Sequence, residues 1–522
     1  MLAVTTNPGG GPDAATTALP GTARGVWTTP AILFWVAGIL VYGGAAINFA
    51  NGHYLDQTMR DLWQHLAALR ALIENPLNPA NPFVISTDGS RHFHPYWVGI
   101  AGIARIFGWN EWQAIGFAGF VTAGTLLAGI WSFGRAFYRS QWGPLALLAA
   151  MVFGWSLPIS HTGYHSPETL IEGIAYPATL LIGLSLLSWA LLIRALEAPR
   201  RAWLLVPLSA FMFATHQLGA GIGFMASGCF LLFWPHGTLR ARIVAGAAIA
   251  AGLLLSAAWP YHNPFDAVLR TGNATWTGGL NFYSPIFLIM AGVPGLIGLW
   301  GLLHPRFARQ ARPVLAAFAL FAGIFALGTA GILIATRFVM PAVLMLHIGI
   351  GALLILAGER WHSLSRPARL GAFAAGMLFV QVHLLLLASH LYWEYGQFSR
   401  YGSAPAAAAR LTADIPDTQP VAAFDVVAWP IVATGQKVVS IPWPEPIIGN
   451  LPERQQVAER LFDPALSRAD RIALARRWGA KTLILDARGP NRRPMPKGLL
   501  TVLEAQSVRH SRVGPFLRFD LE

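Results

Sequence analysis

Long apolar stretches recur along the chain, separated by short polar loops. Nine of these stretches are long enough, or nearly so, to cross roughly 30 Å of hydrocarbon as a helix. Residues 204–234 are too long for one helix, and we interpret them as two short helices broken around residues 215–223, where His216, Gln217 and three glycines interrupt the apolar pattern. The pattern predicts an α-helical polytopic membrane protein with about eleven transmembrane helices. The nine stretches lie at residues 30–50, 112–134, 143–160, 174–193, 243–259, 284–303, 313–334, 338–357 and 370–390.

Arginine clusters in every second loop, as expected of short cytoplasmic loops. This alternation predicts a cytoplasmic N-terminus and places loops 51–110, 161–173 and 260–283 outside. We expect a disordered cytoplasmic tail at residues 1–25, which are rich in Gly, Thr and Pro, and a transmembrane domain at residues 26–392.

The chain changes character after residue 393, where short alternating runs replace the apolar stretches. Residues 420–429, 437–443 and 481–486 have the alternation of strands, and residues 452–462 and 467–478 have helical spacing. Ser467 followed by Asp470 resembles a capping box. Residues 393–522 are therefore predicted to form a small soluble α/β domain on the extracytoplasmic side.

Composition agrees with a membrane protein: 54% of the 522 residues are hydrophobic, 12% are charged, and mean hydropathy is +0.49. The net charge of +13 is largely explained by the cytoplasmic loops and by lipid headgroups, so we expect membrane lipids and no nucleic acid as partners. Cys229, the single cysteine, excludes a disulfide framework. Scarce lysine beside abundant arginine indicates a GC-rich bacterial source and hence the inner membrane.

The loop after the first span contains the candidate chemistry, because it places acids and imidazoles beside the membrane. Asp61 and His65 are four residues apart in a segment, 56–73, with apolar residues at helical spacing. We expect an interfacial helix that presents both side chains on one face and lays its apolar stripe on the bilayer. A repeat of three Asn-Pro pairs and a helix over residues 98–107 follow. Asp88, His92 and His94 match no metal-ligand spacing and are interpreted as shaping the loop.

Other polar residues each allow two interpretations. The outside cluster of His161, His165, Glu168 and Glu172 is either a polar loop cap or a binding site for acceptor or metal. His216 lies at membrane depth and serves either a lipid phosphate or a structural turn. Residues 259–266, with His262 and Asp266, form either an outside loop over a donor or an interface belt. His347, Gln381 and His383 are expected to hydrogen-bond between helices.

The chain resembles the GT-C superfamily of membrane glycosyltransferases, which includes the aminoarabinose transferases of lipid A, protein O-mannosyltransferases and oligosaccharyltransferases. The resemblance rests on the arrangement of these features over the whole topology more than on any one motif, and three stretches match. An acidic first outside loop reads Asp61-Leu62-Trp63-Gln64-His65, a later segment reads His94-Pro95-Tyr96, and a late span opens with Thr336-Arg337-Phe338-Val339-Met340-Pro341. In the family, a second acid is usual where Leu62 stands and an aromatic where His65 stands, and Asp56 is an additional acid.

The resemblance implies a membrane enzyme that moves a sugar from a polyprenyl-phosphate donor to an extracytoplasmic acceptor hydroxyl with inversion. Asp61, or else Asp56, would be the base, and Arg337 would hold the phosphate. The acceptor would be a glycolipid, a polysaccharide or a protein, and the use of a divalent metal is left open. A lipid or sugar transporter or flippase, an O-antigen ligase or polymerase, and a non-catalytic scaffold are the alternatives. From the residues and the resemblance together, the candidate substrate-binding residues are His65, His94, Glu168, His216, His262 and Arg337.

Overall fold

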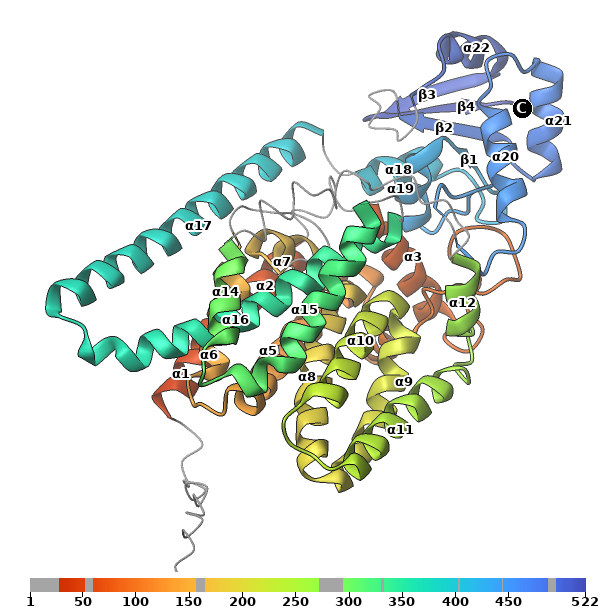
Figure 1. Ribbon diagram of the computed structural model, residues 1–522. Helices are drawn as coiled ribbons and strands as arrows, with labels where there is room; N and C mark the ends of the chain where they lie inside the picture. The colour runs from red at the N-terminus through yellow and green to blue at the C-terminus, as the bar shows by residue number, and fades with distance from the viewer. Residues whose placement is uncertain are drawn as a thin grey trace, which may run out of the picture.

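The computed structural model describes residues 28–51, 60–155, 165–271, 294–329, 333–401, 404–443, 445–486 and 494–522 (Figure 1). Seven helices in these residues are long and apolar enough to cross a membrane. The chain is thus a multi-pass membrane protein. The seven are Thr29–Ala50 (α1, Thr29–Gly38; η1, Ile39–Gly43; α2, Gly44–Ala50), α5 (Glu111–Tyr138), α8 (Pro177–Glu197), α11 (Leu239–Ser256), Ala308–Gly328 in α15 (Ala308–Thr329), Thr336–Ser363 around α16 (Val339–Arg360), and Arg366–Ser389 in α17 (Arg366–Tyr401).

Shorter apolar helices account for other predicted spans. Residues 143–160 contain α6 (Gly143–Phe153), and residues 204–234 divide into α9 (Leu205–Thr215) and α10 (Gln217–Phe233). The predicted break is confirmed, but it is confined to His216, whose backbone is extended with φ −158° and ψ 99°. The glycines expected in the break lie inside α10 instead. Half of the span predicted at 284–303 lies outside the described residues, as does the tail at 1–25. The described half, residues 294–303, contains η4 (Pro294–Leu296) and α14 (Ile297–Leu303).

Glycine allows the closest approach between two spans. A Cβ added to Gly129 of α5 would lie 2.3 Å from the carbonyl oxygen of Gly183 in α8, so the two helices meet backbone to backbone. Such contact is typical of membrane helices, which pack through small residues. Close van der Waals packing therefore stabilises this crossing, and it leaves no room for a larger side chain.

The outside loop contains α3 (Arg60–Glu74) and α4 (Pro95–Phe107). The prediction that the apolar stripe of α3 lies on the bilayer is wrong. Leu62, Leu66 and Leu69 are completely buried inside the protein, where α3 packs between α4, α5 and α19 (Ala428–Ala433) of the C-terminal region. The apolar face of α3 is thus covered by protein and not by lipid.

The C-terminal region contains a four-stranded sheet of order β1-β2-β4-β3 (Figure 1). Strand β1 (Ala422–Ala423) pairs parallel to β2 (Thr482–Asp486), and β4 (Phe516–Asp520) pairs antiparallel to β2 and to β3 (Arg509–Val513). The helices of this region are α18 (Ala404–Thr412), α19, α20 (Leu451–Leu461), α21 (Arg468–Arg477) and α22 (Leu499–Gln506).

Predictions for this region are confirmed at β2, α20 and α21, and Ser467 caps α21 by accepting a hydrogen bond from the backbone N of Asp470 at 3.2 Å. Two predicted strands are wrong. Residues 420–429 contain only the short β1 before the chain turns into η7 (Asp425–Val427) and α19, and residues 437–443 form a single bridge between Val438 and Val421. Apolar runs buried on all sides do not distinguish strand from helix.

Remaining short elements connect these parts. They are α7 (Pro167–Gly173), η2 (Pro199–Leu204), α12 (Pro264–Thr271), η4 (Pro294–Leu296), η5 (Leu333–Phe338) and η6 (Trp361–Ser363).

Candidate functional site

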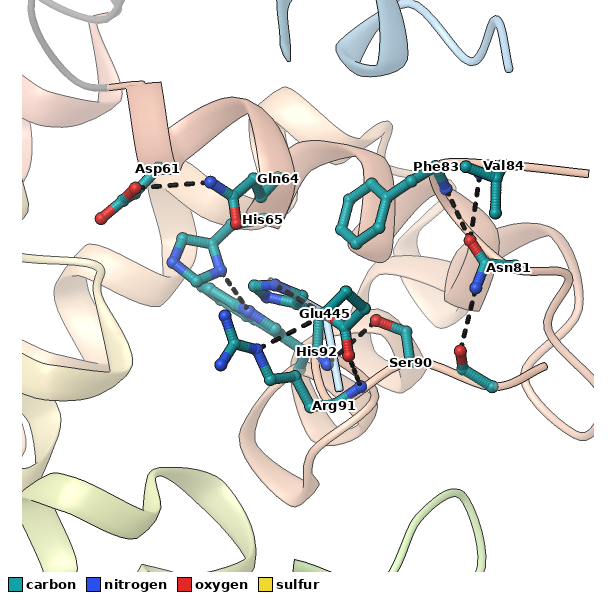
Figure 2. A network of polar contacts seen from close by, with 12 residues as sticks. Asp61, Gln64, His65, Asn81, Phe83, Val84, Ser90, Arg91, His92 and Glu445 are labelled. Carbon is teal, nitrogen blue, oxygen red and sulfur yellow. Dashed lines mark hydrogen bonds and ion pairs between the residues drawn. The ribbon is translucent and has the colours of Figure 1, made fainter. Parts of the chain in front are cut away.

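Asp61 lies in the first turn of α3, where the helix dipole favours a carboxylate. Its side chain is exposed, and Gln64 Nε2 donates a hydrogen bond to Oδ1 at 3.4 Å (Figure 2). Burial raises the pKa of the Tyr176 phenol well above its usual value, and the charges of Asp61 and Glu172 raise it further. Asp61 is therefore an exposed carboxylate close to the neutral hydroxyl of Tyr176.

His65 follows Asp61 by one helical turn but packs inward, with 9% of its surface exposed. Its Nδ1 accepts a hydrogen bond from Trp97 Nε1 at 3.1 Å, and its ring lies 5.2 Å from the ring of Tyr176. Burial lowers the pKa of His65 to about 3, and the nearby His216 and Arg91 add to the shift. The imidazole is thus a neutral hydrogen-bonding group at ordinary pH, and the exposed Asp61–His65 face that we expected does not form.

Arg91 and His92 form the next part of the site, together with a carboxylate from the C-terminal region (Figure 2). Glu445 Oε1 accepts a hydrogen bond from the backbone N of Arg91 at 3.1 Å, and its Oε2 lies 3.4 Å from Arg91 Nε and 3.6 Å from His92 Nε2. Burial lowers the pKa of His92 well below its usual range, and the charges of His65 and Arg91 lower it further. This part of the site thus combines the guanidinium of Arg91 with neutral imidazoles.

His94 caps α4, since its Nδ1 accepts a hydrogen bond from the backbone N of Trp97 at 3.3 Å. Its Nε2 is buried and has no hydrogen-bond partner in the described part of the chain. The same holds for both ring nitrogens of His262. Burial lowers the pKa of His94 well below its usual range and that of His262 to about 4. Buried polar atoms without protein partners are rare and mark positions where a ligand or water bonds.

His216 and Arg337 approach the same cluster from the membrane domain. His216 caps α10 by accepting a hydrogen bond from the backbone N of Gly219 at 3.0 Å. Arg337, half-buried in η5, lies within electrostatic range of His216, which in turn contributes to the field at His65 and His94. Six predicted residues are therefore brought into one neighbourhood: Asp61, His65, His94, His216, His262 and Arg337.

Two predicted residues are not placed there. Asp56 and its neighbours at 52–59 lie outside the described residues, as does His161. Glu168 is in α7, but its side chain is not described. In the same segment His165 is buried, and its Nε2 is 2.8 Å from the hydroxyl of Tyr42. Within the described ranges no group of three or more His, Cys, Asp or Glu is arranged to hold a metal ion.

Arg91, Glu445, Trp97 and Tyr176 belong to the site but were not predicted. For Arg91 a local signal existed, because it lies between the loop residues Asp88 and His92. For Glu445 no sequence signal existed, since no local pattern connects it to a loop more than three hundred residues earlier. His347 and His383, by contrast, hydrogen-bond as predicted between segments, to the carbonyl oxygens of Gly154 at 3.2 Å and Trp155 at 2.9 Å.

The described structure is similar to solved membrane glycosyltransferases. ArnT from Cupriavidus metallidurans, in the apo state, matches with a TM-score of 0.57 and 13% identity over 94% of this chain and 97% of that chain. The Archaeoglobus fulgidus oligosaccharyltransferase matches in two structures at a TM-score of 0.51. The complex with Zn and sulfate is 12% identical over 85% of this chain and 68% of that one. The form tethered to an acceptor peptide is 13% identical over 87% and 69%.

No protein-family model and no curated protein sequence matches the chain. At 13% identity, the similarity to ArnT is one of fold, and it extends over nearly the whole length of both chains. The chain therefore has a GT-C-like fold, a polytopic helical membrane domain followed by a small C-terminal sheet, as the resemblance implied.

Proposed function

We propose that the protein is an integral membrane glycosyltransferase that moves a sugar from a polyprenyl-phosphate donor to an acceptor hydroxyl on the extracytoplasmic side. The GT-C fold supports this kind of reaction. We assign roles to individual residues because Asp61 and Arg337 both lie close to one cluster of buried, neutral histidines. We place the enzyme in a bacterial inner membrane, with the N-terminus in the cytoplasm and the C-terminal region in the periplasm.

Asp61 is proposed as the base. Its exposed carboxylate takes the proton from the acceptor hydroxyl as the hydroxyl oxygen bonds to the anomeric carbon. The bond from that carbon to the phosphate oxygen breaks, and its electron pair leaves with the polyprenyl phosphate. Because attack comes from the side opposite the leaving group, the product has inverted configuration.

Arg337 is proposed to hold the departing phosphate, since a guanidinium pairs with two phosphate oxygens at once. His94 and His262, with buried ring nitrogens that have no partner in the described chain, are suited to hydrogen-bond sugar hydroxyls. Neutral imidazoles are suited to bind a neutral sugar, and the guanidinium of Arg337 is suited to bind the anionic phosphate. The acceptor is proposed to be a glycolipid, a polysaccharide or a protein.

The test is transfer of radiolabelled sugar from polyprenyl-phosphate donors by purified protein in lipid nanodiscs. We expect Asp61→Asn to lower transfer at least about a hundredfold while donor binding is retained, as expected for loss of a general base. Arg337→Ala should weaken donor binding. Asp417→Asn and Arg312→Ala, which alter exposed residues outside the cluster, serve as matched controls.

If Asp56→Asn abolishes transfer and Asp61→Asn does not, the base is Asp56. If the folded wild type transfers no sugar from any donor but exchanges labelled lipid or sugar across the bilayer, the protein is a transporter or flippase instead.

A further inference from the structure

We infer that Glu445 is a positioning residue that aims Arg91 at an anionic group of a substrate, so that the C-terminal region supplies a necessary part of the site. This inference rests on the proposed function. The anionic group is either the phosphate of the donor or an anionic group on the acceptor, and the two sources are separated by the experiment below.

The carboxylate of Glu445 engages Arg91 at two points. Oε1 accepts a hydrogen bond from the backbone N at 3.1 Å, and Oε2 lies 3.4 Å from the guanidinium Nε. Only 2% of the Glu445 surface is exposed, so this is a buried contact and not a surface ion pair. Two contacts to one residue fix both the backbone and the first part of the side chain of Arg91.

The segment containing Glu445 is itself tied to the first loop. The backbone N of Val438 donates a hydrogen bond to the carbonyl oxygen of Phe83 at 2.9 Å. On the other side, Arg454 Nη2 donates to the carbonyl oxygen of Ile85 at 2.9 Å. Bonds before and after Glu445 in the chain therefore anchor it, and a carboxylate anchored in this way can define the position of a partner.

The outer end of Arg91 remains available. Its side chain is 30% exposed, and neither Nη forms a hydrogen bond within the described ranges of the chain. Figure 2 shows the guanidinium turned away from Glu445, on the side of His65 and Asp61. The charge of Arg91 contributes to the lowered pKa values of His65 and His262, which places it among the candidate substrate-binding residues.

An arginine held at Nε presents its two Nη groups as a fixed fork, the geometry that binds an oxyanion through two parallel hydrogen bonds. Holding the side chain in advance removes part of the entropy that binding would otherwise cost. The neighbouring His92 and His94 are neutral, so Arg91 supplies the positive charge on the loop side of the cluster, and Arg337 supplies charge from the membrane domain.

The experiment measures KM and kcat separately for donor and acceptor in nanodiscs, for the wild type, Glu445→Gln, Arg91→Ala and the double variant. Glu445→Gln can still accept the backbone hydrogen bond but loses the charge beside Nε. We expect KM for one substrate to rise about tenfold, as expected when the charge of a buried ion pair is lost, with kcat changed less. A rise for the donor identifies its phosphate as the anion, and a rise for the acceptor identifies the acceptor.

The double variant separates positioning from a structural role. If Glu445 acts through Arg91, adding Glu445→Gln to Arg91→Ala causes no further rise in KM. Additive effects, or unchanged KM in both single variants, overturn the inference. Glu453→Gln, an exposed glutamate in the first turn of α20, is the matched control and should keep wild-type constants.

Two further measurements keep the inference testable. Should Glu445→Gln fail to fold, Arg91→Lys retains the charge but removes the fork, and we expect it to raise the same KM. Binding of polyprenyl phosphate to the nanodiscs, compared with inorganic phosphate, requires no turnover. If the wild type transfers no sugar, the proposed function fails, but a loss of lipid-phosphate binding in both single variants still supports the role of Glu445, and unchanged binding overturns it.

Discussion

Trp97 holds His65 in one tautomer. The indole Nε1 of Trp97 can only donate, and it donates to Nδ1 of His65 at 3.1 Å. Burial keeps the imidazole neutral, so its proton is on Nε2. A tryptophan from α4 therefore decides which ring nitrogen of His65 can donate to a substrate.

Replacing Trp97 with phenylalanine keeps an aromatic ring but removes this donor. We expect Trp97→Phe to reduce sugar transfer about tenfold, because losing a hydrogen bond between buried groups costs about 1–3 kcal/mol and frees the tautomer. The measurement is the transfer rate in nanodiscs. Trp142→Phe, at a residue 49% exposed before α6, is the control, and equal rates for the two variants would contradict the role of Trp97.

Buried neutral histidines make the fold sensitive to acid. Burial lowers the pKa of His65 to about 3 and that of His262 to about 4, whereas an unfolded histidine titrates near about 6.5. Between these values the unfolded chain binds more protons than the folded chain, so stability falls as pH decreases from about 6.5 toward 4. Melting temperatures of the detergent-solubilised protein across this range should fall accordingly.

His262→Gln should make this pH dependence shallower, because one buried titrating group is removed. His236→Gln alters an exposed histidine and should leave the slope unchanged. The explanation fails if all three proteins have the same slope.

Two glycines of α5 are expected to change stability in opposite directions when each is replaced by alanine. Gly129→Ala places a Cβ 2.3 Å from the carbonyl oxygen of Gly183, so we expect it to lower stability by about 1–3 kcal/mol through overpacking. Gly124→Ala meets no atom within 4 Å and should raise stability slightly, since alanine favours helix. Melting temperatures measured in one detergent check both. A decrease for both variants would argue against the close crossing of α5 and α8.

Arg454 fastens the C-terminal region to the first loop. Its guanidinium donates to the carbonyl oxygens of Val439 at 3.0 Å and Ile85 at 2.9 Å. Arg454→Met retains the length of the side chain but loses these bonds, so the loop and the C-terminal region should separate more readily. We expect faster limited proteolysis and a melting temperature lower by several degrees. Arg460→Met, at an exposed position in the same helix, should behave as the wild type.

Local patterns predicted much of the candidate site. Asp61, His65 and His94 stand in a polar loop beside an apolar span, and Arg337 opens a later span, so chain position alone marked them. Their surroundings were not predictable. The apolar residues of α3 have the same spacing whether lipid or protein covers them, and only the packing of α19 shows that it is protein.

The hairpin of β3 and β4 was missed for a related reason. Arg509 and Arg512 interrupt the apolar signal of β3, and its pairing with β4 depends on the turn at Gly514, where φ is 58°. Edge strands of this kind are stabilised by the partner strand more than by their own composition.

The amino-acid sequence by itself determined the transmembrane spans, the helix break at His216, the cap at Ser467 and the acidic loop. These features depend on the free energy of apolar residues in lipid and on bonds between residues a few positions apart. Only the tertiary structure decided which histidines are neutral, which tautomer His65 adopts, and that Glu445 holds Arg91. These depend on burial and on contacts between distant segments, which no local pattern encodes.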